Sequence, residues 1–287
     1  MKIGILGQGF VGSAIKEGLK DHYEILTYDL DNTKSNSTHE EVCNNSEIIF
    51  VCVPTPMRKD GSCDTRILEN AISNIYNTFK KSKKNSAPIL IIKSTVSPGT
   101  TKRINSMYED MTVLFSPEFL TEANSFDDFK NQKRIIIGSH DSSRPEAEKV
   151  KKMFRKVFIP LYTQIVIAES SEAEMCKYFI NCFLATKVTF SNQMFDICKE
   201  SGLDYENVKS LALLDHRIGK SHMMVPGPDG DRGFGGHCFP KDLEAMIYFG
   251  NENNTSSSFL QEVRDYNNTV RKNRDWEKMK GRAVSED

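Results

Sequence analysis

Short apolar runs alternate with amphipathic stretches over about the first 165 residues, and this pattern limits the fold more than any other feature of the chain. Six runs have the length of strands and are rich in isoleucine and valine, namely KIGIL, EILTY, EIIFVCV, PILIIK, TVLFS and RIIIG. Stretches such as DTRILENAISNIYNTFKK, with apolar residues three and four positions apart, lie between several of them. Strands that alternate with helices predict βαβ units and a mostly parallel sheet.

The pattern changes near Ile167, and the rest of the chain has helical periodicity. The stretch SSEAEMCKYFINCFLATKVTFSNQMFDICKESG has no internal glycine or proline, which predicts one long helix. Ser171 and Glu174 have the spacing of a capping box at its start, and Gly202 marks its end. A shorter helix, LDYENVKSLALL, and a last helix, FLQEVRDYNNTVRKNRDWEKM, follow.

These patterns predict the division into domains. We expect an α/β domain over residues 1–167 and an all-α domain over residues 168–255. A terminal helix with a tail would occupy residues 256–287. Within that tail, GRAVSED is the segment expected to be disordered.

Charge and cysteine content indicate the kind of protein. The chain has 38 basic and 39 acidic side chains, so no net charge favours nucleic acid or a membrane surface as a partner. No stretch reaches the roughly 18 apolar residues that a membrane span needs, and the N-terminus is typical of a strand rather than a signal peptide. Seven scattered cysteines without a C-x-x-C pair favour a reducing compartment over a disulfide framework or a zinc site. The six histidines show no metal-ligand spacing, so we expect a cytoplasmic protein without a metal.

Three glycines follow the first apolar run. Gly7, Gly9 and Gly12 have the spacing G-x-G-x-x-G between a predicted strand and a helix-like segment. In that context glycines permit a tight turn and the close approach of a pyrophosphate, whose charge the helix N-terminus attracts. A purely structural glycine turn is the alternative. The predicted dinucleotide contacts in this segment are Gly7, Gly9, Phe10, Val11 and Gly12.

The ends of later strand-like runs also carry candidate ligand contacts. Asp29 ends the second run, where an acidic side chain can bind the ribose hydroxyls of a dinucleotide. Its carboxylate favours NAD, because it would repel the 2′-phosphate of NADP, although Lys34 weakens that preference. Ligands of parallel sheets bind beyond the carboxyl ends of the strands, where Thr55 in VPTP and Thr95 in KSTV lie. Both are predicted cofactor or substrate contacts, and helix capping is an equal alternative for Thr55.

Two pairs of polar residues have helical spacing. Glu118 and Glu122, in SPEFLTEA, would share one face of a helix and could do acid–base work, but solvated surface acids are the commoner explanation. Lys177 and Asn181 are four residues apart on the predicted long helix, among apolar and aromatic neighbours. This pattern alone favours a lysine that extends its ammonium group to water over one with an electrostatic role.

The segment GFGGHCFPKD presents Cys238 on a glycine-rich loop. Pro240 suits the first turn of a helix that LEAMIYF would continue, which places Cys238 at the positive end of that helix. A thiolate is stabilised there, and Lys241 adds positive charge. An inert cysteine in a turn is the alternative, and His237 is interpreted as a loop residue.

In their order along the chain, these motifs resemble those of the UDP-glucose/GDP-mannose dehydrogenase family. The matching segments are GQGFVG, VPTP, KSTVSPGTT, SPEFLTEA, AEMCKYFINCFLA, RIG and GFGGHCFPKD, spread over about residues 1–272. The resemblance implies a Rossmann-type NAD-binding domain with a parallel-rich sheet, followed by an all-α central domain that forms a homodimer. It also implies oxidation of the C6 alcohol of a nucleotide sugar to a carboxylate, with UDP-glucose as the expected substrate and NAD as the hydride acceptor.

The resemblance assigns roles to single residues. Cys238 would add to an aldehyde intermediate, so that a thiohemiacetal is oxidised to a thioester that water cleaves. Lys177 and Asn181 would stabilise the oxyanion, and Asp242 would hold water or the lysine. Arg217, in RIG, would reach the substrate of the other subunit. The remaining positions match family residues linked to water activation and acid–base steps (Glu118, Thr95), to cofactor and substrate (Glu122), and to substrate alone (Phe119, Leu120, Gly235).

Family members normally continue past the last predicted helix into a third domain of about 100 residues, which we expect this chain to lack. A separate chain that supplies this domain is therefore an expected partner. UDP-N-acetylhexosamines and GDP-mannose are alternative substrates. A β-hydroxyacid dehydrogenase would share the two-domain pattern but would not need a nucleophilic cysteine. Outside the enzymes, the alternative is a non-catalytic NAD-binding remnant or partner subunit.

Overall fold

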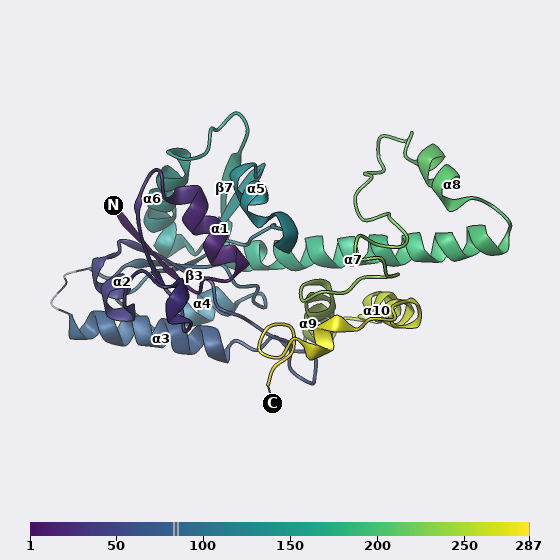
Figure 1. Ribbon diagram of the computed structural model, residues 1–287. Coiled ribbons are helices and arrows are strands. Elements are labelled where there is room, and N and C mark those ends of the chain that lie inside the picture. The colour runs from purple at the N-terminus through teal and green to yellow at the C-terminus, as the bar shows by residue number, and fades with distance from the viewer. Residues whose placement is uncertain (83, 85, 287) are drawn as a thin grey trace. The chain divides into compact units, whose positions relative to one another are not determined.

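The computed structural model describes residues 1–82, 84 and 86–286 (Figure 1). The chain divides into two compact units. Unit 1 comprises Met1–Thr55 and Thr65–Lys177, and unit 2 comprises Pro56–Asp64 and Tyr178–Asp287. The domain bounds at residues 167 and 255 remain an interpretation of the sequence.

Unit 1 is built on a seven-stranded sheet. Its strands are β1 Lys2–Leu6, β2 Glu24–Tyr28, β3 Ile48–Val51, β4 Ile89–Ile92, β5 Val113–Phe115, β6 Arg134–Ser139 and β7 Gln164–Glu169. Its helices are α1 Phe10–Leu19, α2 His39–Asn45, α3 Arg66–Lys81, α4 Thr100–Asn105, α5 Ser125–Lys130 and α6 Arg144–Arg155. Short 3-10 helices are η1 Asn32–Lys34, η2 Glu122–Asn124 and η3 Asp141–Ser143.

The strand order confirms the predicted α/β class. It runs β2-β1-β3-β4-β5-β6-β7, and neighbouring strands are parallel except β5 and β6. The six predicted runs all form strands, but β7 was not predicted. It was missed because Ile167, where the pattern was expected to turn helical, lies inside this strand, directly before a long helix.

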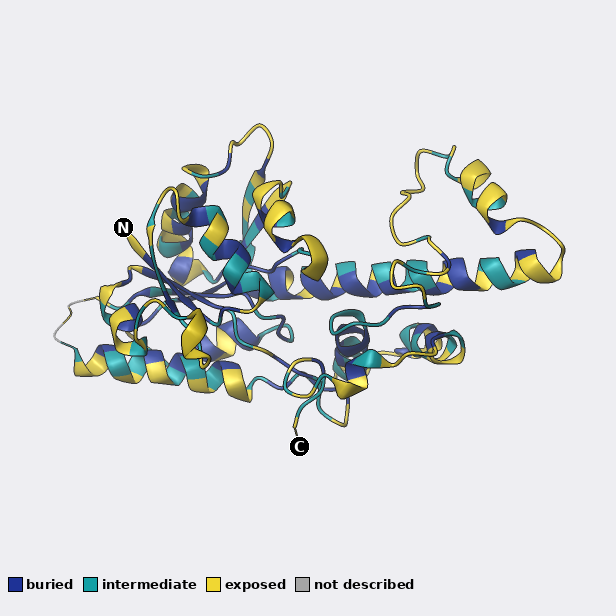
Figure 2. Cartoon of the chain, in the orientation of Figure 1, coloured by how far each residue is buried: buried dark blue, intermediate teal, exposed yellow. Residues whose placement is uncertain are grey.

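The central strands are covered by helices on both faces, which explains why their sequences are continuous apolar runs. All four residues of β3 are buried (Figure 2). On one face, α1 and α6 contribute Ile15 and Phe154 to the core. On the other face, α3 and α4 contribute Ile72 and Ile104. These two helical layers cover both faces of the sheet, so the ends of its strands are where a ligand can bind.

The long helix α7, Ser170–Glu200, begins in unit 1 and continues into unit 2. Its extent agrees with the prediction, but the predicted capping box of Ser171 and Glu174 is wrong. The carboxylate of Glu169 accepts the backbone N–H of Ser171 at 2.6 Å instead. Glu174 is therefore free to serve a different part of unit 1.

Unit 2 has a helical core, as the sequence predicts. Besides its part of α7 it contains α8 Tyr205–Ala212, α9 Phe239–Glu252, α10 Ser258–Val270 and the 3-10 helix η4 Asp275–Lys278. Ala185 of α7, Leu243 of α9 and Val263 of α10 belong to one buried cluster. In the described part of the chain, no helix combines the length and apolar composition that crossing a membrane requires.

The C-terminal tail is folded, which corrects two predictions. The last helix ends at Val270 rather than continuing to residue 279, because the backbone turns extended at Arg271. The tail is not disordered over residues 281–286: Ala283 is 1% exposed, and its carbonyl accepts the backbone N–H of Met57 at 2.8 Å. Asp287, the last residue of the segment predicted to be disordered, lies outside the described residues.

Candidate functional site

The candidate residues of unit 1 gather at one edge of its sheet. Gly7 follows β1, Asp29 follows β2, and Thr55 lies just beyond β3. Thr95 and Glu118 lie just beyond β4 and β5. Because β1 to β5 are mutually parallel, their carboxyl ends share this edge, where ligands of such sheets bind.

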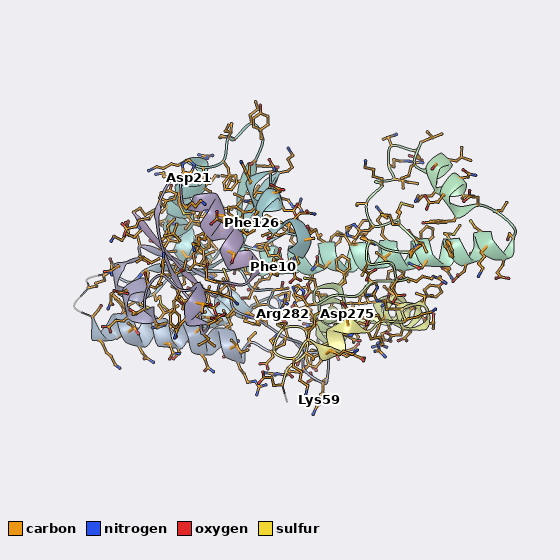
Figure 3. All side chains as sticks on the ribbon, viewed as in Figure 1. Phe10, Asp21, Lys59, Phe126, Asp275 and Arg282 are labelled. Atoms are coloured by element: carbon orange, nitrogen blue, oxygen red, sulfur yellow. The ribbon has the colours of Figure 1, made fainter. Side chains whose placement is uncertain are left out.

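The glycine turn between β1 and α1 is shaped to receive a pyrophosphate. Gly7 has a φ of 89°, and a Cβ there would lie 2.5 Å from the carbonyl oxygen of Cys52. A Cβ on Gly12 would lie 1.9 Å from the carbonyl oxygen of Gly7, so neither position tolerates a side chain. Gly9, the N-cap of α1, has no atom within 4 Å of such a Cβ and leaves open space before Phe10 at the helix start (Figure 3). The residues present therefore fit the phosphates of a dinucleotide.

Asp29 is held beside this turn. Its carboxylate accepts the backbone N–H of Gln8 at 2.6 Å and that of Asp31 at 2.9 Å. The charge of Lys34 is directed to Asp31, 3.3 Å from its carboxylate. An acid fixed next to the glycine turn suits the ribose hydroxyls of NAD.

Thr55 and Thr95 are joined to each other. The hydroxyl of Thr55 donates to the carbonyl oxygen of Thr95 at 2.6 Å, and both residues are buried. Thr55 therefore does not cap a helix, and its bond ties the loops after β3 and β4 together. The role of both threonines in binding a ligand stays a prediction.

The carboxylate pair predicted for SPEFLTEA is not formed. Residues 116–121 are not helical, so Glu118 and Glu122 do not share a helix face. Glu118 is 8% exposed, whereas Glu122 begins η2 on the exposed surface. Only Glu118 has the surroundings of a functional acid.

Glu118 is paired with Lys177 inside unit 1. The Lys177 ammonium group donates to Glu118 Oε1 at 3.0 Å and to its carbonyl oxygen at 2.9 Å. Lys177 is 4% exposed, so the expectation that it extends to water is wrong. Burial favours the neutral acid, but Lys177 and the Leu120 N–H at 2.6 Å outweigh it and lower the pKa of Glu118. Phe119 lies under the same ammonium group, with its ring centre 5.6 Å away.

In unit 2, Cys238 is the N-cap of α9, as predicted. Its side chain is half-buried, and Pro240 lies in the first turn, where its missing N–H costs nothing. Gly233 and Gly236 have φ values of 68° and 70°, which explains the glycine content of the approach to the cysteine. A thiolate at Cys238 would lie at the positive end of a 14-residue helix.

The same helical turn holds a buried ion pair. Asp242 is 1% exposed and accepts hydrogen bonds from the Lys241 ammonium group and from the Asn181 amide. Burial opposes the charge of Lys241, but Asp242 and Cys238 outweigh burial and raise its pKa. Lys241 therefore stays positively charged beside the cysteine. Asn181 lies four residues after Lys177 on α7.

Burial makes other cysteines poor nucleophiles. No disulfide forms among the seven cysteines, all of which the structure describes, and burial raises the pKa of Cys52, Cys43 and Cys182 to about 12. Cys198 is 2% exposed. Cys238, by contrast, is half-buried at a helix N-terminus.

The loop before Cys238 is fastened to the C-terminal tail. The Arg271 side chain is 1% exposed and pairs with Asp229 at 2.6 Å and with Asp275 at 3.5 Å. Asp275 (Figure 3) also accepts the backbone N–H of Gly236 at 3.1 Å. A Cβ on Gly235 would lie 2.3 Å from the Arg271 guanidinium, so this glycine lets the arginine approach the loop. Sequence reasoning missed Arg271 and Asp275, because no local spacing connects them to the cysteine.

Arg217 is exposed on its own unit. Its side chain is 78% exposed and pairs with the carboxylate of Asp215. The expected role of Arg217 at the other subunit's substrate stays a prediction.

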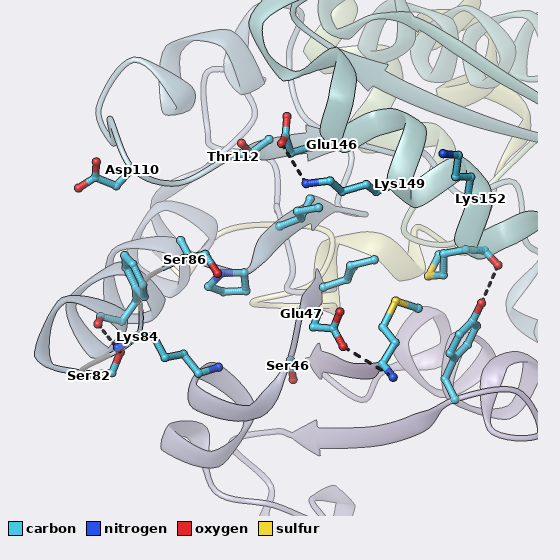
Figure 4. Close-up of a pocket in the computed structure, with 18 of the residues that line it drawn as sticks. Ser46, Glu47, Ser82, Lys84, Ser86, Asp110, Thr112, Glu146, Lys149 and Lys152 are labelled. Carbon is cyan, nitrogen blue, oxygen red and sulfur yellow. Dashed lines mark hydrogen bonds and ion pairs between the residues drawn. The ribbon is translucent and has the colours of Figure 1, made fainter.

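A large hollow in unit 1 lies away from these residues. It has a volume of about 1100 Å³ and includes Ile48 and Ile89, which begin β3 and β4, at the edge opposite the candidate site (Figure 4). Several of its charged groups are paired with one another: Lys149 with Glu146, the N-terminal amine with Glu47, and Lys80 with Asp110. None of the predicted site residues lines this hollow.

Comparison with known proteins decides the family. Residues 31–158 match the model for the NAD binding domain of the UDP-glucose/GDP-mannose dehydrogenase family, and residues 171–269 match the model for its central domain. The chain belongs to this family. Its NAD binding domain identifies NAD as the cofactor, in agreement with the turn at Gly9 and with Asp29.

Several dehydrogenases are similar to this family member over most of its length. The protein YtcA of Bacillus subtilis (strain 168) is 30% identical over 304 residues, which cover 94% of this chain and 68% of that protein. The UDP-glucose 6-dehydrogenase of Rickettsia bellii is 33% identical and covers 87% of this chain. The structure of a UDP-glucose dehydrogenase from Pyrobaculum islandicum superimposes with a TM-score of 0.82 at 27% identity over 93% of this chain and 68% of that chain. The chain spans 55% of the length of the Rickettsia bellii enzyme.

Two charged residues near the site were not predicted from the sequence. Lys93 closes the run PILIIK and is 8% exposed, and Glu174 of α7 is fully buried. Glu174 accepts backbone N–H groups of Gly99 and Thr101 at 2.6 and 2.8 Å, and so caps α4 from a distant part of unit 1. The sequence signal that could have pointed to Lys93 is a charged residue at the end of an apolar run, and for Glu174 it is a charged residue inside an apolar helix.

Proposed function

We propose that this family member is an NAD-dependent nucleotide-sugar dehydrogenase that oxidises the C6 alcohol of UDP-glucose to the carboxylate. The observation that carries the proposal is Cys238 at the N-cap of α9, with the charged Lys241 in the same turn. Oxidation of an alcohol to an aldehyde needs no cysteine. Oxidation of an aldehyde to an acid does gain from one, because a bare aldehyde gives up its hydride poorly.

Unit 1 would bind the cofactor. The open space at Gly9 suits the pyrophosphate, and Asp29 suits the adenosine ribose. NAD supplies the hydride acceptor for both oxidations. The loops held together by Thr55 and Thr95 would border the nicotinamide end at the same strand edge.

Cys238 would carry the second oxidation. After the alcohol has lost a hydride and a proton, the thiolate adds to the aldehyde carbon, a C–S bond forms, and the oxygen takes a proton. Loss of a second hydride and of that proton gives a thioester. Water then attacks the carbonyl, the C–S bond breaks, and the carboxylate and the thiolate are released.

Polar residues of α7 would stabilise these steps. Lys177 and Asn181 would face the oxyanion that forms when the thiolate or water adds, where a pre-placed positive charge is most effective. Glu118, kept ionised by Lys177, suits the role of accepting a proton from water. Asp242 would hold Asn181 in place through their hydrogen bond.

We also propose a cytoplasmic homodimer. Four apolar side chains on α7 are more than half exposed, which favours a second subunit against this helix. Arg217, itself exposed, would then reach the substrate of the other subunit. A separate chain with a nucleotide-binding domain is a further proposed partner. The four side chains are Phe179, Phe183, Phe190 and Ile197.

NADH formation at 340 nm, with UDP-glucose limiting, tests the proposal. We expect two NADH per sugar from the wild-type chain and at most one from Cys238→Ser. Cys198→Ala, a change at a buried cysteine in the core of unit 2, should still form two NADH per sugar. One NADH per sugar from the wild type would contradict the thioester route, as would unchanged stoichiometry in Cys238→Ser. Turnover only with UDP-N-acetylhexosamine or GDP-mannose would keep the mechanism and refute UDP-glucose as substrate.

A further inference from the structure

Two buried ammonium groups donate hydrogen bonds to the segment that carries Glu118. Lys93, directly after β4, is 8% exposed, and its ammonium group donates to the carbonyl oxygen of Pro117 at 3.0 Å and to the hydroxyl of Ser116 at 3.3 Å. Lys177 donates to the carbonyl oxygen and the carboxylate of Glu118. Ser116, Pro117 and Glu118, three consecutive residues, thus each accept a hydrogen bond from a buried lysine.

The sheet register places Lys93 where it is. Its backbone N–H donates to the carbonyl oxygen of Val51 at 3.0 Å, and the N–H of Ser116 donates to that of Ile92 at 2.9 Å. These bonds extend the parallel pairing of β3, β4 and β5 by one residue beyond the strands. Lys93 is therefore fixed beside Ser116 by the backbone before its side chain makes any contact.

Burying a lysine costs folding free energy, so a role other than ending β4 is needed to explain Lys93. Desolvation disfavours its charged form, and a leucine or valine would fill such a place more cheaply. Three titratable groups face Lys93, namely Cys52 after β3, Glu118 after β5 and Lys177 on α7. Burial raises the pKa of Cys52 to about 12, so that Glu118 is the negative charge among the three.

We propose that Lys93 is a positioning residue of the dehydrogenase reaction: it fixes the segment Ser116–Glu118 and supplies a second positive charge that faces the Glu118 carboxylate. The inference rests on the proposed function, in which Glu118 accepts a proton from water. Lys177 holds the side chain of Glu118, and Lys93 holds the peptide that precedes it.

The second charge makes Glu118 adjustable by pH. Burial and the nearby Lys177 lower the pKa of Lys93 to about 8, against the attraction of the Glu118 carboxylate. Below that pH the carboxylate faces two cations and is a weak proton acceptor. Above it one cation remains, and Glu118 accepts a proton more readily, so the rate of thioester hydrolysis rises. The neutral amine still donates to Pro117, which keeps the segment in place.

A pH profile of kcat, which includes the hydrolysis of the thioester, between pH 6 and 10 tests this role in the full chain. The wild type should show a rise with an inflection near pH 8. Lys93→Arg, which stays charged, and Lys93→Met, which is never charged, should both lose that inflection. Lys93→Met should also lower kcat by about a hundredfold through misplacement of Glu118, with the KM for NAD unchanged. Lys80→Met, at an exposed ion pair of unit 1, should behave as the wild type.

A readout without turnover separates this inference from the proposed function. The carboxyl carbon of Glu118 can be titrated by NMR, with its resonance identified by its loss in Glu118→Gln. In Lys93→Met that titration should move to higher pH, because the carboxylate has lost a cation. An unchanged titration and an unchanged pH profile would overturn the role of Lys93. A wild-type chain that forms no NADH would refute the proposed function, and the titration would still decide whether Lys93 sets the charge of Glu118.

Discussion

Replacement of Arg271 by methionine should loosen the C-terminal tail from the cysteine loop. The arginine side chain is 1% exposed and pairs with Asp229 at 2.6 Å, Asp275 at 3.5 Å and Asp231 at 3.6 Å. Its Nε also donates to the carbonyl oxygen of Asn273 at 2.7 Å. Removing one partner of a buried ionic cluster costs about 3–5 kcal/mol when the other charges stay buried.

The solvent exposure of the three aspartates that pair with Arg271 decides where between about 3 and 5 kcal/mol the loss of stability lies. The side chains of Asp229, Asp231 and Asp275 are 51%, 19% and 28% exposed, so water can reach them once the guanidinium is gone. Asp275 also keeps its bond to the Gly236 N–H at 3.1 Å. We therefore expect a loss near the lower end, about 3 kcal/mol, or roughly 10 °C in Tm for a chain of this size.

Trp276 provides the assay. It is the only tryptophan of the chain, is 5% exposed and follows Asp275 directly, so its fluorescence reports release of the tail. Guanidinium chloride unfolding followed at this residue should show the loss in Arg271→Met. Arg264→Met removes a partly exposed arginine from unit 2 and should cost less than about 1 kcal/mol. If Arg271→Met unfolds within about 0.5 kcal/mol of the wild type, the cluster does not hold the tail and this argument is wrong.

Two further predictions concern unit 1. Burial raises the pKa of Glu174 from 4.5 to about 7 against its hydrogen bonds, so the folded chain keeps a proton that the unfolded chain releases. This proton stabilises the folded chain by about 3 kcal/mol below pH 4.5, and that stability is lost as the pH rises to 7. Urea unfolding at several pH values should show the free energy of unfolding fall over this range in the wild type and stay flatter in Glu174→Gln. An equal pH dependence in both proteins would count against the pKa assigned to Glu174. Gly9→Ala should leave Tm unchanged, since its Cβ meets nothing within 4 Å, but weaken NAD binding by at least about tenfold. Gly12→Ala, with its Cβ 1.9 Å from the Gly7 carbonyl, should lower Tm, and equal Tm values for the two variants would contradict the geometry.

Local signals in the sequence were sufficient for much of the fold and for the cysteine. The six apolar runs became strands because sheets buried on both faces require such runs. Pro240 and the glycines before it placed Cys238 at a helix start, and α9 begins there. Each of these features depends on neighbours within a few residues, which is why a pattern could predict it.

Features that join distant segments could not be predicted in the same way. Lys177 lies 59 residues from Glu118, and nothing in the helical periodicity of α7 distinguishes a buried ion pair from a lysine that reaches water. Glu174 had the spacing of a capping box, but it caps α4 instead, more than 70 residues away. The motif SPEFLTEA has helical spacing yet is not helical at Glu118, where the sheet register and two lysines hold the chain.

Two of the buried lysines beside candidate catalytic groups, Lys241 and Lys93, differ in the pH range over which they are charged. Lys241 shares a hydrogen bond with the Asp242 carboxylate, and this neighbour outweighs burial, so its charge beside Cys238 persists well above neutral pH. Among the described residues, Lys93 donates to two neutral oxygens, and Lys177 also faces the Glu118 carboxylate. Burial therefore prevails, and the charge of Lys93 is lost near pH 8. A nucleophilic thiolate needs a cation throughout its working range, whereas a proton acceptor gains strength when a cation leaves. The different partners of the two lysines therefore suit the different tasks proposed for Cys238 and Glu118.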